Sequence, residues 1–275
     1  MSMRISRILN NNAIVVIHGE QEKIVMGSGI AFQKSKNDIV PQSKIEKVFV
    51  LHEHTSEKFQ QLLSTLPEKH IELAELIIDY AEGYLEEPLH DHIHIALTDH
   101  LSFAIERIEQ GFTIQNKLTN EIKLLYHREF QIGLWARKLI NETINIEIPL
   151  DEVAHIALHI HTAKIGGKSM SESMEKASII RDFIELVERH LNIKVNESSI
   201  NYQRLITHLR FALNRMAEGS DFDPIDPDMH QLIKEKYSSV YEISEAIASK
   251  LNEDYKINFP SSEIAYITLH LQRLI

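Results

Sequence analysis

The stretch Asp-His-Leu-Ser-Phe-Ala-Ile-Glu-Arg at residues 99–107 recurs as Thr-His-Leu-Arg-Phe-Ala-Leu-Asn-Arg at residues 207–215, with five of nine positions identical. A second stretch, Glu-Val-Ala-His-Ile-Ala-Leu-His at residues 152–159, recurs as Glu-Ile-Ala-Tyr-Ile-Thr-Leu-His at residues 263–270. The two offsets are 108 and 111 residues, so the second copy carries a three-residue insertion. A period of about 110 residues is too long for stacked repeats of 20 to 50 residues. The chain therefore contains a duplicated domain.

Both copies have the spacing of helices. Apolar residues recur every three or four positions, as at Ile71, Ala74, Ile78 and Ala81, which is typical of one helix face. Six prolines separate such segments: Pro67, Pro88, Pro149, Pro224, Pro227 and Pro260. From residue 57 onward we expect two homologous all-α helical bundles, at 57–168 and 169–275, with a linker at Gly166–Ser169 and the insertion in the loop at residues 223–227.

The first 50 residues differ in charge and pattern. They hold seven Lys and Arg against four Asp and Glu, a net charge of +3, whereas the remainder of the chain carries −14. Short β-branched runs alternate with turn residues, which indicates hairpins: residues 14–17, 24–26 and 48–50 against turns at 18–20, 27–29 and 36–38. We expect a small all-β antiparallel domain at residues 1–56. Since so few residues bury little apolar area, we expect this domain to be dimeric.

Composition excludes several classes of protein. With no cysteine among 275 residues, thiolate catalysis, disulfides and cysteine zinc sites are ruled out, and a cytoplasmic location is expected. Nine glycines are few for nucleotide-binding loops. Gly167-Lys168-Ser169 resembles the end of a P-loop, but the required upstream glycine is Thr162. No apolar run reaches the roughly 20 residues that span a bilayer.

Histidines are duplicated along with the core. His100 pairs with His208, and His159 pairs with His270. Neutral imidazole is a nucleophile near pH 7 and can carry a phosphoryl group. Arg107 and Arg215 each follow their histidine by seven residues, which is two helical turns, and so lie on the same helical face. They could contact a phosphoryl group on the histidine, or they could lie on a solvated face. A buried histidine with a structural role stays open as the alternative.

Metal binding is a weaker alternative. A cluster at residues 90–100 and the i, i+4 pair of His155 and His159 have ligand-like spacing, but Tyr266 replaces His155 in the second copy. A further asymmetry is Asp99 before His100, where the second copy has Thr207. If Asp99 orients the imidazole, the two copies are unequal phosphoryl acceptors.

Three segments of the N-terminal β domain, which we call the head, carry a family resemblance: Ile5–Ala13 (ISRILNNNA), Met26–Lys34 (MGSGIAFQK) and Ile45–Phe49 (IEKVF). They resemble the co-antiterminator RNA-binding domain of the BglG/SacY/LicT-type transcriptional antiterminators. The duplicated body resembles the two PTS-regulation domains (PRDs) that follow in that family. The resemblance covers essentially the whole chain and implies a dimeric RNA-binding regulator rather than an enzyme, without cofactor or metal.

The resemblance also implies site residues and partners. The family's RNA-contact positions fall on Arg7, Asn10, Asn12, Gly27, Ser28, Phe32 and Gln33. Asn and Gln suit base edges, and Phe suits stacking, although Phe32 equally fits the sheet core and the asparagines equally fit turns. Some members have a basic residue at the position of Ser28, which removes one phosphate contact here.

The partners implied are a leader-RNA antiterminator hairpin, the phosphocarrier protein HPr and a sugar-specific PTS permease. The phosphorylation sites implied in the first PRD are His100 and His159, whose phosphorylation by the permease is typically inhibitory. Those implied in the second PRD are His208 and His270, whose phosphorylation by HPr is typically activating. The alternatives are a PRD-containing DNA-binding activator, for which no helix-turn-helix pattern precedes the body, and, more distantly, a histidine-rich metal-dependent hydrolase.

Overall fold

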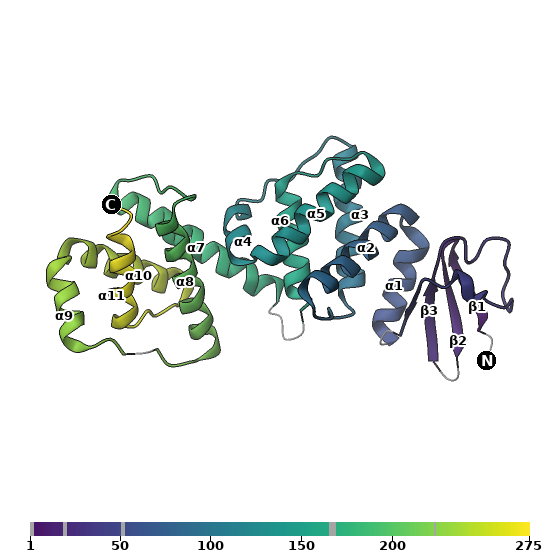
Figure 1. The fold of residues 1–275 in the computed structure, drawn as a ribbon, viewed down its shortest axis with the longest axis horizontal. Helices are drawn as coiled ribbons and strands as arrows, with labels where there is room; N and C mark the ends of the chain where they lie inside the picture. Colours follow the sequence, from purple (N-terminus) through teal and green to yellow (C-terminus); the bar gives the residue numbers. More distant parts are fainter. Residues whose placement is uncertain (1–2, 19–20, 51–52, 165–168, 223) are drawn as a thin grey trace. The chain divides into compact units, whose positions relative to one another are not determined.

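The computed structural model describes residues 3–18, 21–50, 53–164, 169–222 and 224–275 (Figure 1). They form two compact units. The first comprises Met1–Asn116 with Arg128–Lys168, and the second comprises Lys117–His127 with Ser169–Ile275. No helix in the described ranges is long and apolar enough to cross a membrane.

The N-terminal domain is a four-stranded antiparallel sheet in the order β1-β2-β3-β4. Its strands are β1 (Arg4–Asn10), β2 (Ala13–His18), β3 (Gln21–Met26) and β4 (Lys47–Phe49), and a 3-10 helix, η1 (Gln42–Lys44), precedes β4. The pairing of Ile14 with Val25 and of Val25 with Val48 sets the register across the last three strands. The expected small antiparallel domain is confirmed, and the expected turn at residues 18–20 falls mostly outside the described residues.

Each face of this sheet buries a separate apolar cluster. One face packs under the loop that follows β3, through Ile5, Ile14, Val16, Val25, Ile30, Ala31 and Val40. The other face packs against helices α1 (Glu53–Thr65) and α2 (Glu68–Leu85), through Ala13, Ile24, Met26, Phe49, Phe59, Leu63 and Ile71. The apolar area that the head lacks by itself is thus supplied within the chain by α1 and α2. The expected dimer stays a prediction.

The rest of the chain is helical and repeats itself helix by helix. The first copy contains α2, α3 (Ile93–Glu109), α4 (Thr119–Leu125), α5 (His127–Ile144) and α6 (Leu150–Thr162). The second contains α7 (Met170–Leu191), α8 (Ile200–Glu218), α9 (Pro227–Lys236), α10 (Ser238–Tyr255) and α11 (Ser261–Leu271). Gly111 and Gly219, which follow α3 and α8, both have left-handed backbone, with φ of 82° and 64°. The prediction of two homologous all-α domains is confirmed.

Helix α4 packs with the second compact unit. It belongs to the first copy in the chain, but its segment Lys117–His127 is part of the unit that contains the second copy. The hydroxyl of Tyr126 donates a hydrogen bond to the backbone oxygen of Ser173 in α7, at 3.2 Å. Ile122 and Leu125 are buried as well. An apolar helix face packs where it buries most area, whatever the sequence order.

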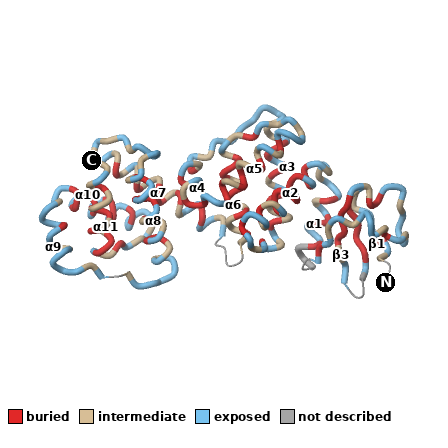
Figure 2. Tube along the Cα trace, viewed as in Figure 1, coloured by how far each residue is buried: buried red, intermediate tan, exposed pale blue. Residues whose placement is uncertain are grey.

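The prolines fall between helices, as expected. Pro67, Pro149 and Pro260 are the residues before α2, α6 and α11, and Pro227 is the first residue of α9. Buried residues run along the inner faces of the helices (Figure 2). The expected linker at Gly166–Ser169 lies outside the described residues except for Ser169, which caps α7.

Candidate functional site

The histidines of the first copy meet between α3 and α6. The ring centroids of His100 and His159 are 4.8 Å apart. Nε2 of His100 lies 3.2 Å from Oε2 of Glu152, which is 1% exposed and belongs to the first turn of α6. Arg107, two turns beyond His100, forms an ion pair with the other oxygen of the same carboxylate. His155 also lies beside His100, with centroids 5.4 Å apart.

The second copy repeats this arrangement between α8 and α11. The ring centroids of His208 and His270 are 5.0 Å apart, and Nε2 of His208 lies 2.9 Å from Oε2 of Glu263. Glu263 is 3% exposed and, like Glu152, belongs to the first turn of its helix. Tyr266 takes the place of His155, with its ring 5.9 Å from that of His208. We call each set of two histidines and one glutamate a histidine centre.

Burial sets the protonation of these groups. It lowers the pKa of His159 to about 3, with a further decrease from the charge of His100. It lowers the pKa of His270 to about 4, with further decreases from His208, Arg273 and Arg204. Both rings are therefore neutral near pH 7 and retain a nucleophilic nitrogen. Burial by itself would raise the pKa of Glu152, but His100 and Arg107 outweigh it and hold that pKa below its ordinary value.

The two glutamates were not predicted from the sequence, where the only carboxylate considered beside His100 is Asp99, as a hypothesis. Asp99 is exposed, and the carboxylate that lies against the imidazole of His100 is Glu152. A signal was present, because Glu152 and Glu263 begin the second pair of repeated stretches. Arg107 is bound to this carboxylate, so the interpretation that it lies on a solvated face is wrong.

The two centres differ in their surrounding charge. Arg204 and Arg273 act on His270 in the second centre. The repeat offsets place Ala96 and Thr162 at the equivalent positions of the first copy. The second centre therefore has the more positive surroundings, which favours an approaching phosphoryl anion.

Within the histidine cluster at residues 90–100, His94 contacts a different carboxylate from His100. Nδ1 of His94 lies 2.8 Å from Oε1 of Glu75, and the His94 ring packs on Phe49 of the sheet. Within the described ranges, no group of three or more His, Asp and Glu side chains could hold a metal ion.

Several of the expected RNA-contact residues meet in the N-terminal domain. Asn12 accepts a hydrogen bond at its side-chain Oδ1 from the backbone N–H of Gly29 (2.7 Å) and at its backbone oxygen from that of Gly27 (2.9 Å). Oδ1 of Asn10 accepts from the backbone N–H of Asn12, at 2.8 Å. We call this group, Asn10, Asn12 and the turn at residues 27–29, the amide turn.

Two further residues of the set follow the amide turn. Phe32 is 60% exposed, which excludes the sheet-core interpretation and leaves its ring face open for stacking. Gln33 is exposed and has a left-handed backbone, with φ of 55°. Gly27 has a steric role, because a Cβ there would lie 1.8 Å from the backbone oxygen of Lys44. Exposed Ser28 donates its backbone N–H to Glu46, at 3.0 Å.

Helices α1 and α2 contact three residues of the expected set. Arg7 donates a hydrogen bond to the side chain of Gln60, away from the amide turn. Nδ2 of Asn10 donates to the backbone oxygen of Leu63, at 2.7 Å. Asn12 donates to Glu68 and Glu72. The structure thus brings Asn10, Asn12, Gly27 and Ser28 together, and it places Arg7 elsewhere.

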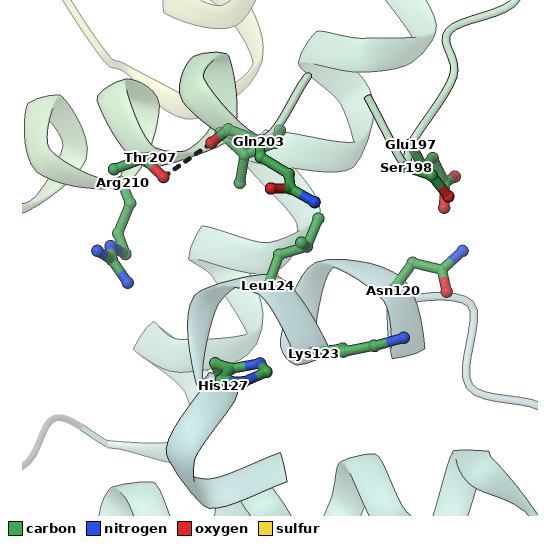
Figure 3. A pocket seen from close by; sticks show the side chains of 10 residues that line it. Asn120, Lys123, Leu124, His127, Glu197, Ser198, Gln203, Thr207 and Arg210 are labelled. Carbon is green, nitrogen blue, oxygen red and sulfur yellow. Dashed lines mark hydrogen bonds between the residues drawn. The ribbon is translucent and has the colours of Figure 1, made fainter. Parts of the chain in front are cut away.

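Two hollows lie along α8 in the second unit. One, of about 410 Å³, adjoins the second histidine centre and is lined by Ile200, Gln203, Arg204, Thr207, His208, Phe211 and His270. The other, of about 470 Å³, lies between α8 and α4 (Figure 3). There Lys123, His127 and Arg210 face a hollow that also includes Glu197, and Thr207 donates a hydrogen bond to the backbone oxygen of Gln203. The mixed charge of this second hollow favours no single ligand.

Comparisons with known proteins match the parts of this architecture. The CAT RNA binding domain model matches residues 3–58, and the PRD domain model matches residues 75–163 and 181–274. The chain is 37% identical over 275 residues to transcription antiterminator LicT of Bacillus subtilis, covering 99% of both chains. It is 34% identical over 274 residues to the beta-glucoside operon antiterminator of Dickeya chrysanthemi, covering 99% of this chain and 96% of the relative.

A solved structure also resembles the first part of the chain. The crystal structure of GlcT CAT-PRDI matches with a TM-score of 0.54 and 35% identity, covering 60% of this chain and 99% of that one. The order of a sheet domain followed by two helical copies agrees with these matches. The chain therefore belongs to the BglG/SacY/LicT-type transcription antiterminators, which join a CAT RNA-binding domain to two PRD domains.

Proposed function

We propose that this chain is a sugar-responsive antiterminator that binds a partly paired hairpin in a nascent leader RNA. A stabilised hairpin excludes an overlapping terminator, so the polymerase continues into sugar-utilisation genes. The amide turn supports RNA recognition, because side-chain amides and backbone close to a glycine suit the edges of unpaired bases. Exposed Phe32 adds a stacking surface, and the positive charge of the head favours phosphates.

The regulatory part of the proposal rests above all on the histidine centre that occurs twice. In it we propose His100 and His159 as acceptors of a phosphoryl group from a sugar-specific PTS permease, with an inhibitory effect. We propose His208 and His270 as acceptors from HPr, with an activating effect. A phosphoryl group adds up to two negative charges beside a buried carboxylate, which is enough to alter the packing of helices around it. The extra arginines at the second centre favour two unequal sites.

The RNA-binding part is tested by titrating the full chain against an RNA hairpin with internal loops, a DNA duplex of the same sequence and an unstructured RNA. Each titration is repeated at several salt concentrations, because phosphate contacts make affinity salt-dependent. We expect tight binding to the hairpin alone, by a dimer. Equal affinity for all three nucleic acids would contradict the proposal.

A variant pair locates the site. Phe32→Ala removes an exposed ring from the head, and Phe112→Ala removes an equally exposed ring, 65% accessible, from the loop after α3. Loss of one stacked base costs about 1–3 kcal/mol, so we expect hairpin affinity to fall about 5- to 150-fold for Phe32→Ala. Phe112→Ala should bind as the parent chain does.

A further inference from the structure

Each histidine centre holds one ring nitrogen against a buried carboxylate. In both copies that nitrogen is Nε2, of His100 beside Glu152 and of His208 beside Glu263. The distances, 3.2 and 2.9 Å, are close to each other although the two centres lie in separate copies. Both carboxylates belong to the first turn of a helix, where the helix dipole favours negative charge.

The two rings are partly exposed, but their Nε2 atoms are buried. The side chains of His100 and His208 are 19% and 23% exposed. Among the described residues, Nε2 of both rings is buried and forms no hydrogen bond of standard geometry, so it faces the carboxylate through a close ionic contact. The exposed part of each ring is thus not Nε2. A phosphoryl donor on another protein must reach a nitrogen from outside, along the direction of its lone pair.

We propose that Nδ1 of His100 and Nδ1 of His208 are the atoms that accept the phosphoryl group, and that Glu152 and Glu263 are the positioning residues that select them. This inference rests on the proposed function and specifies its chemistry. A carboxylate beside Nε2 favours the tautomer with its proton on Nε2, which leaves the lone pair on Nδ1.

The transfer balances without a further reactant. The lone pair of Nδ1 attacks the phosphorus of a phosphohistidine on the donor protein, and a new N–P bond forms. The donor's N–P bond breaks, and its electron pair returns to the donor imidazole, which was protonated on its other nitrogen and leaves neutral. The phosphorylated ring keeps its proton on Nε2, so its positive charge lies beside the glutamate. Since that charge keeps the N–P bond labile, the same contact favours transfer in either direction.

The surroundings of His208 provide the approach. The hollow lined by Arg204, Gln203 and Phe211 adjoins this histidine, and Arg204 can pair with an incoming phosphoryl oxygen. Across the centre, burial lowers the pKa of His270 to about 4, so that ring is neutral and brings no charge of its own. A phosphoryl group on Nδ1 of His208 would therefore have Arg204 on its open side, and the imidazole ring would separate it from the carboxylate of Glu263.

The isomer of phosphohistidine is the direct test. The full chain, labelled with 15N in its histidines, is phosphorylated with phospho-HPr, unfolded at alkaline pH and studied by proton–nitrogen NMR, which separates rings phosphorylated on Nδ1 from those phosphorylated on Nε2. Mass spectrometry of the peptides assigns each signal to a histidine. We expect Nδ1 isomers at His208 and, to a lesser extent with this donor, at His100.

The outcomes separate the two proposals. Phosphorylation of His208 on Nε2 would overturn the assignment of the atom and leave the proposed function intact. Absence of phosphohistidine throughout the chain would overturn the proposed function and this assignment with it.

Matched variants test the positioning role. Glu152→Gln and Glu263→Gln keep the shape of the side chain and remove its charge, so we expect a mixture of isomers at the adjacent histidine and about a tenfold slower transfer to it. Asp99→Asn, which removes an exposed carboxylate next to His100, is the control and should leave both isomer and rate unchanged. Pure Nδ1 product at an unchanged rate in Glu263→Gln would overturn the role of the glutamate. If that variant fails to fold, the isomer in the parent chain decides the assignment.

Discussion

Nδ2 of Asn12, in the turn between β1 and β2, donates a hydrogen bond to Oε1 of Glu72 in α2, at 3.0 Å. The same nitrogen lies 3.2 Å from Oε2 of Glu68, one helical turn earlier. The backbone N–H of Asn11 donates to Oε1 of Glu68, also at 3.0 Å. Two carboxylates thus occupy donors of the amide turn that we propose for RNA, and RNA must displace them.

Removing these charges should strengthen RNA binding by the full chain. In the double variant Glu68→Gln, Glu72→Gln, the amide turn keeps uncharged partners, but two negative charges no longer repel RNA phosphates. We expect hairpin affinity to rise about tenfold, or about 1.4 kcal/mol, at low salt and by less at high salt. Binding titration at two salt concentrations measures the effect.

The control for this prediction is a double variant that changes the net charge by the same amount as Glu68→Gln with Glu72→Gln. Glu142→Gln with Glu253→Gln alters two exposed carboxylates, one in α5 and one in α10, far along the chain from the head. It should leave affinity within about twofold. Equal affinities of the two double variants would show that Glu68 and Glu72 do not compete with RNA.

Gly27→Ala should disrupt the amide turn through sterics alone. A Cβ at residue 27 would overlap the backbone oxygen of Lys44, and backbone yields only with movement of the loop. We expect the free energy of unfolding of the head to fall by about 1–3 kcal/mol and hairpin affinity to fall with it. Thermal unfolding and RNA titration measure the two effects.

A second glycine provides the comparison. Gly83 lies inside α2, and a Cβ there would meet no atom within 4 Å. Gly83→Ala should therefore raise helix stability by about 0.5–1 kcal/mol and leave RNA affinity unchanged. A Gly27→Ala chain as stable as Gly83→Ala would contradict the role assigned to the close approach at Lys44.

The sequence predicted what local periodicity and internal repetition encode. Hairpins, helices, the duplicated domain and the pairing of His100 with His208 follow from spacing along one chain. The buried partner of each histidine did not follow, because Glu152 lies 52 residues away and charged residues are usually expected at the surface. The hypothesis about Asp99 rests on its being adjacent to His100 in sequence, whereas consecutive residues of a helix point to different faces.

Packing between elements was also beyond sequence reasoning. The apolar face of the sheet predicted a partner, but only the structure identifies Phe59 and Leu63 of α1 as residues that cover it. Helix α4 similarly carries an apolar face whose partner, α7, comes about 50 residues later in the chain. A sequence pattern shows which face of an element must be buried. Which other element covers that face depends on all the apolar surfaces available in the fold.

Acid should destabilise the first unit through His159. Its pKa is about 3 in the folded protein and about 6.5 when unfolded, so below pH 6.5 the unfolded chain binds a proton that the folded chain does not. The contribution is absent above pH 6.5 and grows as pH falls toward 3. His159→Gln should remove about 1.4 kcal/mol per pH unit from the slope of stability between pH 6 and 5.

Tryptophan fluorescence measures the pH dependence of stability in the first compact unit, which contains His159. Trp135 is the only tryptophan of the chain, lies in α5 and stacks on Tyr80, so its signal follows unfolding of the first unit. His190→Gln, at an exposed histidine near the end of α7, is the control and should keep the parent slope. If His159→Gln keeps that slope too, His159 is not the buried neutral ring described above.

Arg204 should tune the second histidine centre electrostatically. The charge of Arg204 lowers the pKa of His270, so Arg204→Gln should raise that pKa, though it should stay below 6.5 because burial is the larger cause. The same substitution removes a positive charge from the hollow beside His208, and we expect phosphoryl transfer from phospho-HPr to slow about 3- to 10-fold, with less dependence on salt. NMR titration of the His270 ring and the initial rate of phosphorylation measure the two effects.

Arg189→Gln, at an exposed arginine of α7, is the control, since it changes net charge by the same amount and should alter neither the His270 pKa nor the rate. An unchanged His270 pKa together with an unchanged rate would mean that solvent screens Arg204 fully, and the asymmetry between the two centres would then need another cause.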